Sequence, residues 1–96
     1  MTEFVLSPAA QADADGIWDY TAKHWGVDQA ESYTADIGDT CRELAAGSRS
    51  SYVVDVRDGY RKAFVGKHVV FFKTDGSGRI TIMRILHQRM DAEINL

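Results

Sequence analysis

The chain has 96 residues, of which 45% are hydrophobic and 26% are charged, and its formal net charge at pH 7 is -3. This length fits one domain spanning residues 1–96, and the composition is ordinary for a water-soluble globular protein. We expect neither a membrane span nor a signal peptide, because the apolar runs are short and no basic segment precedes an apolar stretch at the N-terminus. The single cysteine, Cys41, excludes an internal disulfide and favours a reducing, cytoplasmic location.

The charge is divided unevenly between the two halves of the chain. Residues 1–50 carry nine acids and three bases, whereas residues 51–96 carry five acids and eight bases. This division predicts an acidic helical surface and a basic sheet or tail. The imbalance does not distinguish an acidic protein from RNA as the partner of the basic half.

The chain opens with the pattern of a short strand followed by a helix. Residues 3–6 have strand character, and the Ser7 hydroxyl and Pro8 suit the cap and first turn of a helix. The helix runs to Trp25, and Gly26 is its stop. Its apolar positions follow helical spacing at Ala10, Ala14, Ile17, Tyr20 and Thr21.

A second helix begins almost at once. Asp28 and Glu31 fit a capping box, and Gly47 ends the helix. So short a link predicts an antiparallel helical hairpin, and Gly38 predicts close packing between its two helices. Trp18 and Trp25 can pack within the fold or anchor an interface with a partner, and their helical spacing favours packing. The other helical side chains expected in the core, rather than in contact with a partner, are Ile17, Tyr20, Ile37, Cys41 and Leu44.

The second half of the chain has the patterns of strands. They occupy residues 60–65, 67–73 and 79–86, and a hairpin turn at residues 75–78 joins the last two. Residues 48–59 either pair at a sheet edge or cross over the helices. The sequence therefore predicts an α+β fold. Its N-terminal strand precedes an antiparallel helical hairpin that packs on one face of a mostly antiparallel sheet of three to four strands.

The last two strands are apolar on both faces. Alternation places Val69 and Phe71 on one face and Val70 and Phe72 on the other. In the final strand, alternation places Ile80, Ile82 and Leu86 on one face and Met83 and Ile85 on the other. A sheet of this kind must be covered on both sides, and the helical hairpin covers one. We therefore expect Val69 and Phe71 to be core residues, and a second polypeptide to bury apolar surface that the helices do not reach.

Polar residues that can carry function gather at the ends of these strands. If Arg61, His68, His87 and Arg89 converge, they can cleave RNA, with a base taking the 2′-hydroxyl proton and an arginine stabilising the phosphorane. Alternatively, Arg61 and Arg84 pair with acids such as Asp91 or those of the helices, and the histidines cap strand ends. The predicted functional surface is Tyr60, Arg61, Lys67, His68, Arg84, His87 and Arg89.

No metal or cofactor is expected. His24, His68 and His87 are widely spaced and lack the short spacings of metal ligands. Gly66 and Lys67 lack the other glycines of a phosphate-binding loop and lead into a strand.

Four segments resemble the ParE branch of the RelE/ParE toxin superfamily. They occur in the family's order and cover nearly the whole chain: residues 6–10 with 17–20, residues 25–30, residues 59–62 leading into 66–72, and residues 84–91. The sharpest match is Leu86-His87 followed by Met90-Asp91. The chain departs from the ParE pattern at residues 46–56, which puts contacts assigned to that loop in doubt.

The resemblance implies a toxin of a type II toxin–antitoxin pair. Such toxins are understood to block DNA gyrase by binding, without catalysis and without binding DNA alone. A ParD-like antitoxin neutralises them by wrapping its C-terminal helix and tail around the toxin, in assemblies of two toxins with two antitoxins or a multiple. The antitoxin then supplies the missing cover for the sheet.

Two other functions stay open at this point. One is a RelE-like, ribosome-dependent messenger RNA interferase, although His68 stands where such relatives usually carry an arginine. The other is a non-toxic binding module whose apolar sheet face forms a homodimer.

Overall fold

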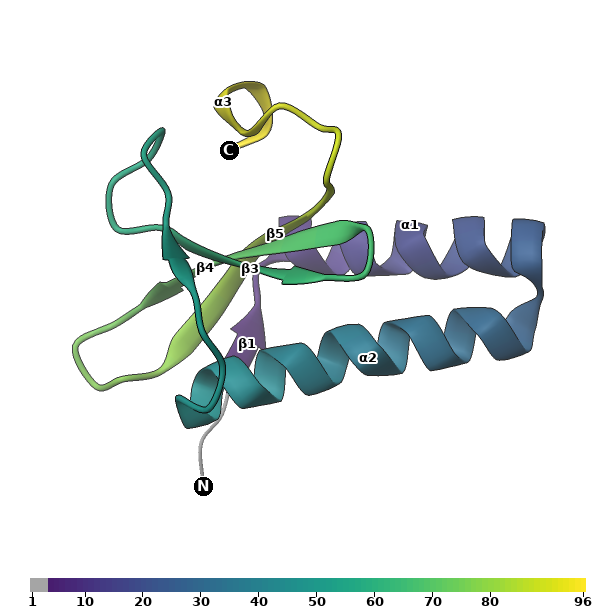
Figure 1. Ribbon diagram of the computed structural model, residues 1–96, viewed down its shortest axis with the longest axis horizontal. Helices are drawn as coiled ribbons and strands as arrows, with labels where there is room; N and C mark the ends of the chain where they lie inside the picture. The colour runs from purple at the N-terminus through teal and green to yellow at the C-terminus, as the bar shows by residue number, and fades with distance from the viewer. Residues whose placement is uncertain (1–3) are drawn as a thin grey trace.

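A helical hairpin covers one face of a mixed sheet in the computed structural model, which describes residues 4–96 (Figure 1). The predicted α+β order is confirmed, while Glu3, placed in the first strand, lies outside the described residues. The elements are β1 (Phe4–Leu6), α1 (Pro8–Trp25), α2 (Val27–Ala46), β2 (Tyr52–Val53), β3 (Arg61–Val65), β4 (His68–Thr74), β5 (Ile80–His87) and α3 (Ala92–Asn95).

Within the described residues 4–96, five strands lie in the order β1-β5-β4-β3-β2. Of these, β1 pairs in parallel with β5, and the other neighbouring strands are antiparallel. The segment left open by the sequence does pair at a sheet edge, but only through Tyr52 and Val53, which lie opposite Lys62 and Arg61. No helix within residues 4–96 is long and apolar enough to cross a membrane.

The start of α1 and the link to α2 follow from local chemistry. The Ser7 hydroxyl accepts the Ala10 amide proton at 3.0 Å and donates to the Met83 carbonyl at 2.8 Å, so this cap also ties α1 to β5. Gly26, at φ 96°, donates its amide proton to the Ala22 carbonyl and accepts from the Ala30 amide. One residue therefore ends α1 and begins α2.

Two expectations about α2 are wrong. The helix begins at Val27 with no side-chain cap, so the capping box of Asp28 and Glu31 does not form, because the Gly26 backbone already caps the helix. A Cβ atom built on Gly38 would approach only Arg42 of the same helix, so Gly38 marks no close contact with α1.

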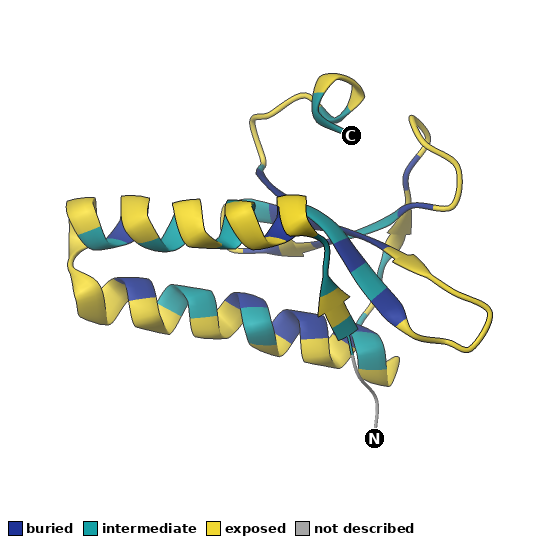
Figure 2. Cartoon of the chain, turned by 180° about the vertical axis from the view of Figure 1, so that it is seen from behind, coloured by how far each residue is buried: buried dark blue, intermediate teal, exposed yellow. Residues whose placement is uncertain are grey.

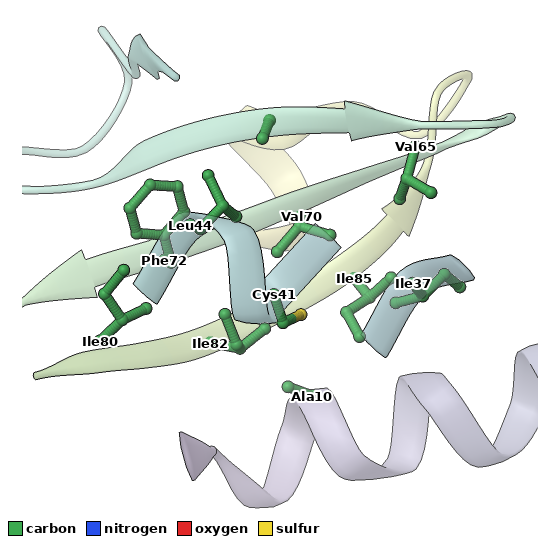
Figure 3. Packing of buried hydrophobic residues seen from close by; sticks show 11 residues of the cluster. Ala10, Ile37, Cys41, Leu44, Val65, Val70, Phe72, Ile80, Ile82 and Ile85 are labelled. Atoms are coloured by element: carbon green, nitrogen blue, oxygen red, sulfur yellow. The ribbon is translucent and has the colours of Figure 1, made fainter. Parts of the chain in front are cut away.

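The main core lies between the hairpin and the sheet. Figure 3 shows Ile37, Cys41 and Leu44 of α2 packed against side chains of the sheet such as Val70 and Ile82. Ile17 packs against this cluster from α1. Figure 2 shows that the buried residues of both helices face inward. The predicted helical core is confirmed at these positions.

The aromatic residues near the hairpin tip depart from the prediction. Tyr20 is 62% exposed and Trp25 is 73% exposed, whereas Trp18 is half-buried. The hairpin extends beyond the end of the sheet (Figure 1), so the sheet does not cover this part of α1.

The other face of the sheet is covered by the chain itself. Val69, Phe71 and Leu86 form a second buried cluster with Val54 and Tyr60. Ala92 and Leu96, from the end of the chain, pack against it. Val69 and Phe71 are thus core residues as predicted, but these side chains do not await a second polypeptide. The segment after β2 and the C-terminal turn already bury them.

A β-bulge changes the faces of β5. Phe71 lies opposite Arg84 while Phe72 lies opposite Ile82, so Met83 is an extra residue in β5. Ile85 therefore joins Ile82 in the core beneath the helices, and Leu86 faces the second cluster with Met83. Strict alternation predicted the reverse for Ile85 and Leu86, while the alternation in β4 is confirmed.

Candidate functional site

The two strand-end histidines are brought together. His68 at the start of β4 lies opposite His87 at the end of β5, and their ring centroids are 5.4 Å apart in an edge-on arrangement. Lys67 precedes this pair in the β3–β4 turn, and Arg89 follows it with an exposed side chain. The Arg89 amide donates to His87 Nδ1 at 3.2 Å.

Arg61 does not converge with the histidines. It lies at the far end of β3 from Val65, the residue opposite His68, and is therefore about 13 Å away along the sheet. Its Nε donates to the Ser51 hydroxyl at 2.7 Å and its Nη2 to the Ser51 carbonyl at 2.8 Å. Arg61 thus tethers the segment that leads into β2, and the four-residue catalytic cluster does not form.

Tyr60 and the basic groups beside it belong to the opposite face of the sheet. Tyr60 is only 6% exposed, within the second cluster. The Arg57 guanidinium lies 5.2 Å from its ring centroid and the Lys73 ammonium 5.6 Å from it. This tyrosine therefore offers little surface to a partner.

Arg84 joins α1 to the sheet through Asp13. Its Nε and Nη2 donate to the two carboxylate oxygens at 2.8 and 3.0 Å, and the Ile85 amide donates to Asp13 at 2.9 Å. Its Nη1 donates to the Asn95 carbonyl at 2.8 Å. The hydrogen bonds to Asp13 hold the pKa of Arg84 above its usual value. The expectation that Arg84 pairs with an acid of the helical hairpin is confirmed.

Tyr33 of α2 links the helices to the histidine pair. Its hydroxyl lies 2.6 Å from His68 Nδ1, accepts the Lys67 amide proton at 3.1 Å and lies 3.4 Å from the Val65 carbonyl. Burial raises the pKa of Tyr33. Burial, with His87 as a lesser cause, lowers the pKa of His68, which favours neutral imidazole. Tyr33 was not among the site residues expected from the sequence, and no local pattern indicated this contact.

Gly66 makes room for this contact. It lies at φ 54°, and a Cβ atom there would stand 2.6 Å from the Tyr33 ring. The turn between β3 and β4 therefore requires glycine for its conformation and for its approach to α2.

A groove of about 1020 Å³ runs between the hairpin and this end of the sheet. The exposed side chains of Tyr20 and Trp25 form part of the lining of this groove. The other apolar side chains that line it include Ile17, Ile85, Leu86 and Met90, and the polar ones include Asp13, Tyr33, Lys67, His68 and His87.

The groove combines apolar walls with a basic end, which consists of Lys67, His68 and His87. These walls suit the binding of an amphipathic ligand better than catalysis. Of the arginines that the sequence suggested for this site, Arg61 is hydrogen-bonded to Ser51 and Arg84 to Asp13. Within residues 4–96 no group of three or more histidine, cysteine or acidic side chains is placed to hold a metal ion.

Comparison with known proteins places the whole chain in one family. The family model described as ParE toxin of type II toxin-antitoxin system, parDE, matches residues 4–92. Toxin ParE1 of Mycobacterium tuberculosis (strain ATCC 25618 / H37Rv) is 45% identical over 96 residues, covering 99% of this chain and 98% of the relative. Toxin ParE1 of Caulobacter vibrioides (strain ATCC 19089 / CIP 103742 / CB 15) is 37% identical over 97 residues, covering 100% and 99%.

A solved structure shares the fold. A chain described as the chromosomal ParDE TA system from P. aeruginosa superposes with a TM-score of 0.77 at 23% identity, covering 91% of this chain and 96% of that chain. Since the family model spans nearly every residue and the relatives match from end to end, the chain belongs to the ParE toxin family of type II toxin–antitoxin systems.

Proposed function

We propose that this protein arrests bacterial growth by binding DNA gyrase without catalysis, and that a ParD-like antitoxin silences it. Membership of the ParE toxin family supports both parts. The observation that carries the non-catalytic part is the dispersal of the basic residues: Arg61 is bound to Ser51 and Arg84 to Asp13. Its site of action is then the cytoplasm, where gyrase is found.

Gyrase inhibition is tested by a supercoiling assay with purified gyrase and increasing amounts of the purified toxin. We expect supercoiling to fall with toxin concentration and to recover when a cognate ParD-like antitoxin is added. Full supercoiling at saturating toxin would contradict the proposed target, while growth arrest on expression would still mark the protein as a toxin. Expression without growth arrest would instead favour the non-toxic binding module.

The groove and its basic end are the surface we propose for the antitoxin. Of the residues predicted to bind a partner, Lys67, His68 and His87 line this groove, and Arg89 follows His87. Its apolar walls suit an amphipathic segment laid into a groove. We expect two toxins to assemble with two antitoxins, which the mass of the purified complex in analytical ultracentrifugation tests.

The paired histidines favour a second candidate, a ribosome-dependent messenger RNA interferase. His68 and His87 lie side by side with Lys67 close to them, so proton transfer near a phosphate is chemically feasible. Primer extension on translated RNA tests it. Cleavage that disappears in His87→Ala and Arg89→Ala while both variants stay folded would replace the gyrase proposal.

A further inference from the structure

The hydrogen bonds at the basic end of the groove fix where each imidazole carries its proton. The Arg89 backbone amide can only donate, and it lies 3.2 Å from His87 Nδ1. Nδ1 of His87 must therefore be the acceptor. In a neutral imidazole with an unprotonated Nδ1, the proton is on Nε2.

His68 has the same tautomer for a different reason. The Tyr33 hydroxyl accepts the Lys67 amide proton at 3.1 Å and has one proton to donate. His68 Nδ1 at 2.6 Å is a much closer acceptor than the Val65 carbonyl at 3.4 Å. We therefore assign the hydroxyl proton to the shorter bond, to Nδ1, and with it a hydrogen to Nε2 of His68.

Both Nε2–H groups are open to a ligand. Neither takes part in a hydrogen bond within the part of the chain that the structure describes, and no buried side-chain nitrogen or oxygen there lacks a partner. The two Nε2 atoms must then reach solvent, and both residues line the groove together with Lys67. Asp13, the one acid among the described groove residues, is engaged by Arg84 and the Ile85 amide.

We propose that the Nε2–H groups of His68 and His87, with the Lys67 ammonium, form a site for one carboxylate. The carboxylate belongs to an acidic side chain of a polypeptide segment whose apolar side chains occupy the rest of the groove. A carboxylate that accepts from imidazole N–H groups and from an ammonium forms charge-assisted hydrogen bonds, and all three groups line the same groove. The inference rests on the proposed function, in which this segment is part of the antitoxin.

Charge and lining favour a peptide carboxylate over other ligands. The groove walls are largely apolar, which suits a polypeptide segment with apolar side chains. Residues 8–46 of the hairpin carry eight acids against two bases, and this charge repels the continuous negative charge of a nucleic-acid backbone far more than a single carboxylate. A metal ion would require unprotonated Nε2 atoms and further ligands, and both nitrogens carry hydrogen.

The first experiment uses paired substitutions in the toxin–antitoxin complex at pH 7.5. Glutamine places an amide N–H near the position of Nε2, whereas asparagine places an acceptor near the position of Nδ1. We expect His87→Asn to weaken antitoxin binding about tenfold or more, and His87→Gln to weaken it far less. His68→Asn and His68→Gln should repeat the pattern, measured by calorimetry or surface plasmon resonance.

The reverse order overturns the inference. If His87→Asn binds like the wild type and His87→Gln is weakened, His87 acts only by holding the Arg89 amide. If all four variants bind like the wild type, neither Nε2–H takes part, yet the proposed function stands because the antitoxin binds. If the wild-type protein binds no antitoxin, the proposed function fails, and the carboxylate site is judged on the free protein.

The second experiment therefore titrates the free wild-type protein with sodium acetate and follows the imidazole nitrogens by NMR. We expect acetate to shift the Nε2–H signals of both His68 and His87, with little change in sodium chloride of equal ionic strength. Absence of an acetate shift overturns the site. A larger response to sodium phosphate than to acetate also overturns it, because the ligand would then be a phosphate group.

Discussion

The contact between Gly66 and Tyr33 gives the sharpest test of how this end of the molecule is built. In Gly66→Ala, the new Cβ atom would lie 2.6 Å from Tyr33 Cε1 and 2.7 Å from its hydroxyl. The Tyr33 side chain has to move, and its hydroxyl then leaves His68 and the Lys67 amide. The substitution therefore combines backbone strain with a steric clash and broken hydrogen bonds.

The expected cost is taken as the sum of the backbone strain and the overpacking. An alanine in the left-handed region, at φ 54°, costs about 1–2 kcal/mol, and overpacking costs about 1–3 kcal/mol. We expect Gly66→Ala to lower the free energy of unfolding by about 2–5 kcal/mol. A domain of this size has about 5–15 kcal/mol in total, so much of the variant population should remain folded.

Urea unfolding of a double-mutant cycle separates strain from clash. With Tyr33→Ala as the background, Gly66→Ala should cost only the backbone strain, about 1–2 kcal/mol. Gly47→Ala is the matched control, because Gly47 has φ 74° and nothing within 4 Å of its Cβ position. The reasoning is refuted if Gly66→Ala costs the same with and without the Tyr33 ring, or no more than Gly47→Ala.

Three further predictions concern stability and reactivity. Asp13→Ala should lower the free energy of unfolding, measured in urea, by about 2–3 kcal/mol, because the Arg84 guanidinium and the Ile85 amide lose their acceptor. Asp15→Ala, on the exposed side of the same helix, should change it by no more than about 0.5 kcal/mol. Equal costs for the two variants would contradict this prediction. The lowered pKa of His68 means that the unfolded chain protonates first as the pH falls below about 6.5, so stability should decline from there down to the folded pKa. His68→Gln should flatten that part of the profile between pH 7.5 and 5.5, and an unchanged slope would refute it. Burial raises the pKa of the Cys41 thiol to about 11 from 9.0, so a thiol reagent at pH 8 should react with native protein at least about 100-fold more slowly than with unfolded protein.

The features that the sequence predicted well depend on neighbours in the chain. The bounds of α1 follow from Ser7, Pro8 and Gly26, and the alternation of β4 from successive residues. The bulge at Met83 is different, because it is a property of the pairing between β4 and β5. Without the register, strict alternation places Ile85 and Leu86 on the wrong faces.

The covered second face could not be predicted for a related reason. Only a chain segment that returns to the sheet from a distance can bury Val69 and Phe71, and residues 54–60 gave no periodic pattern that shows such a return. Leu96 is a lone apolar residue at the end of the chain, yet it packs on this cluster. The expectation that a second polypeptide must cover this face was based on the helices alone. It did not consider that irregular segments of the same chain could cover it.

His68 and His87 could be identified from the sequence because both lie at strand ends. Tyr33, which contacts His68, could not. Tyr33 lies 35 residues from His68 in the chain, and Asp13 lies 71 residues from Arg84. Contacts of such separation depend on the hairpin lying across the sheet. Basic residues near the ends of neighbouring strands therefore looked equivalent in the sequence, although Arg84 pairs with Asp13 and Lys67 has no ion-pair partner within residues 4–96.

The donor pattern at the end of the groove is consequently a property of the fold. If Tyr33 is moved or replaced, His68 loses the hydrogen bond that assigns its proton to Nε2, and its two tautomers become closer in energy. His87 keeps its tautomer, because the Arg89 amide still occupies its Nδ1. Partner binding should then weaken through His68 alone in Tyr33→Phe, even where the folded population is intact.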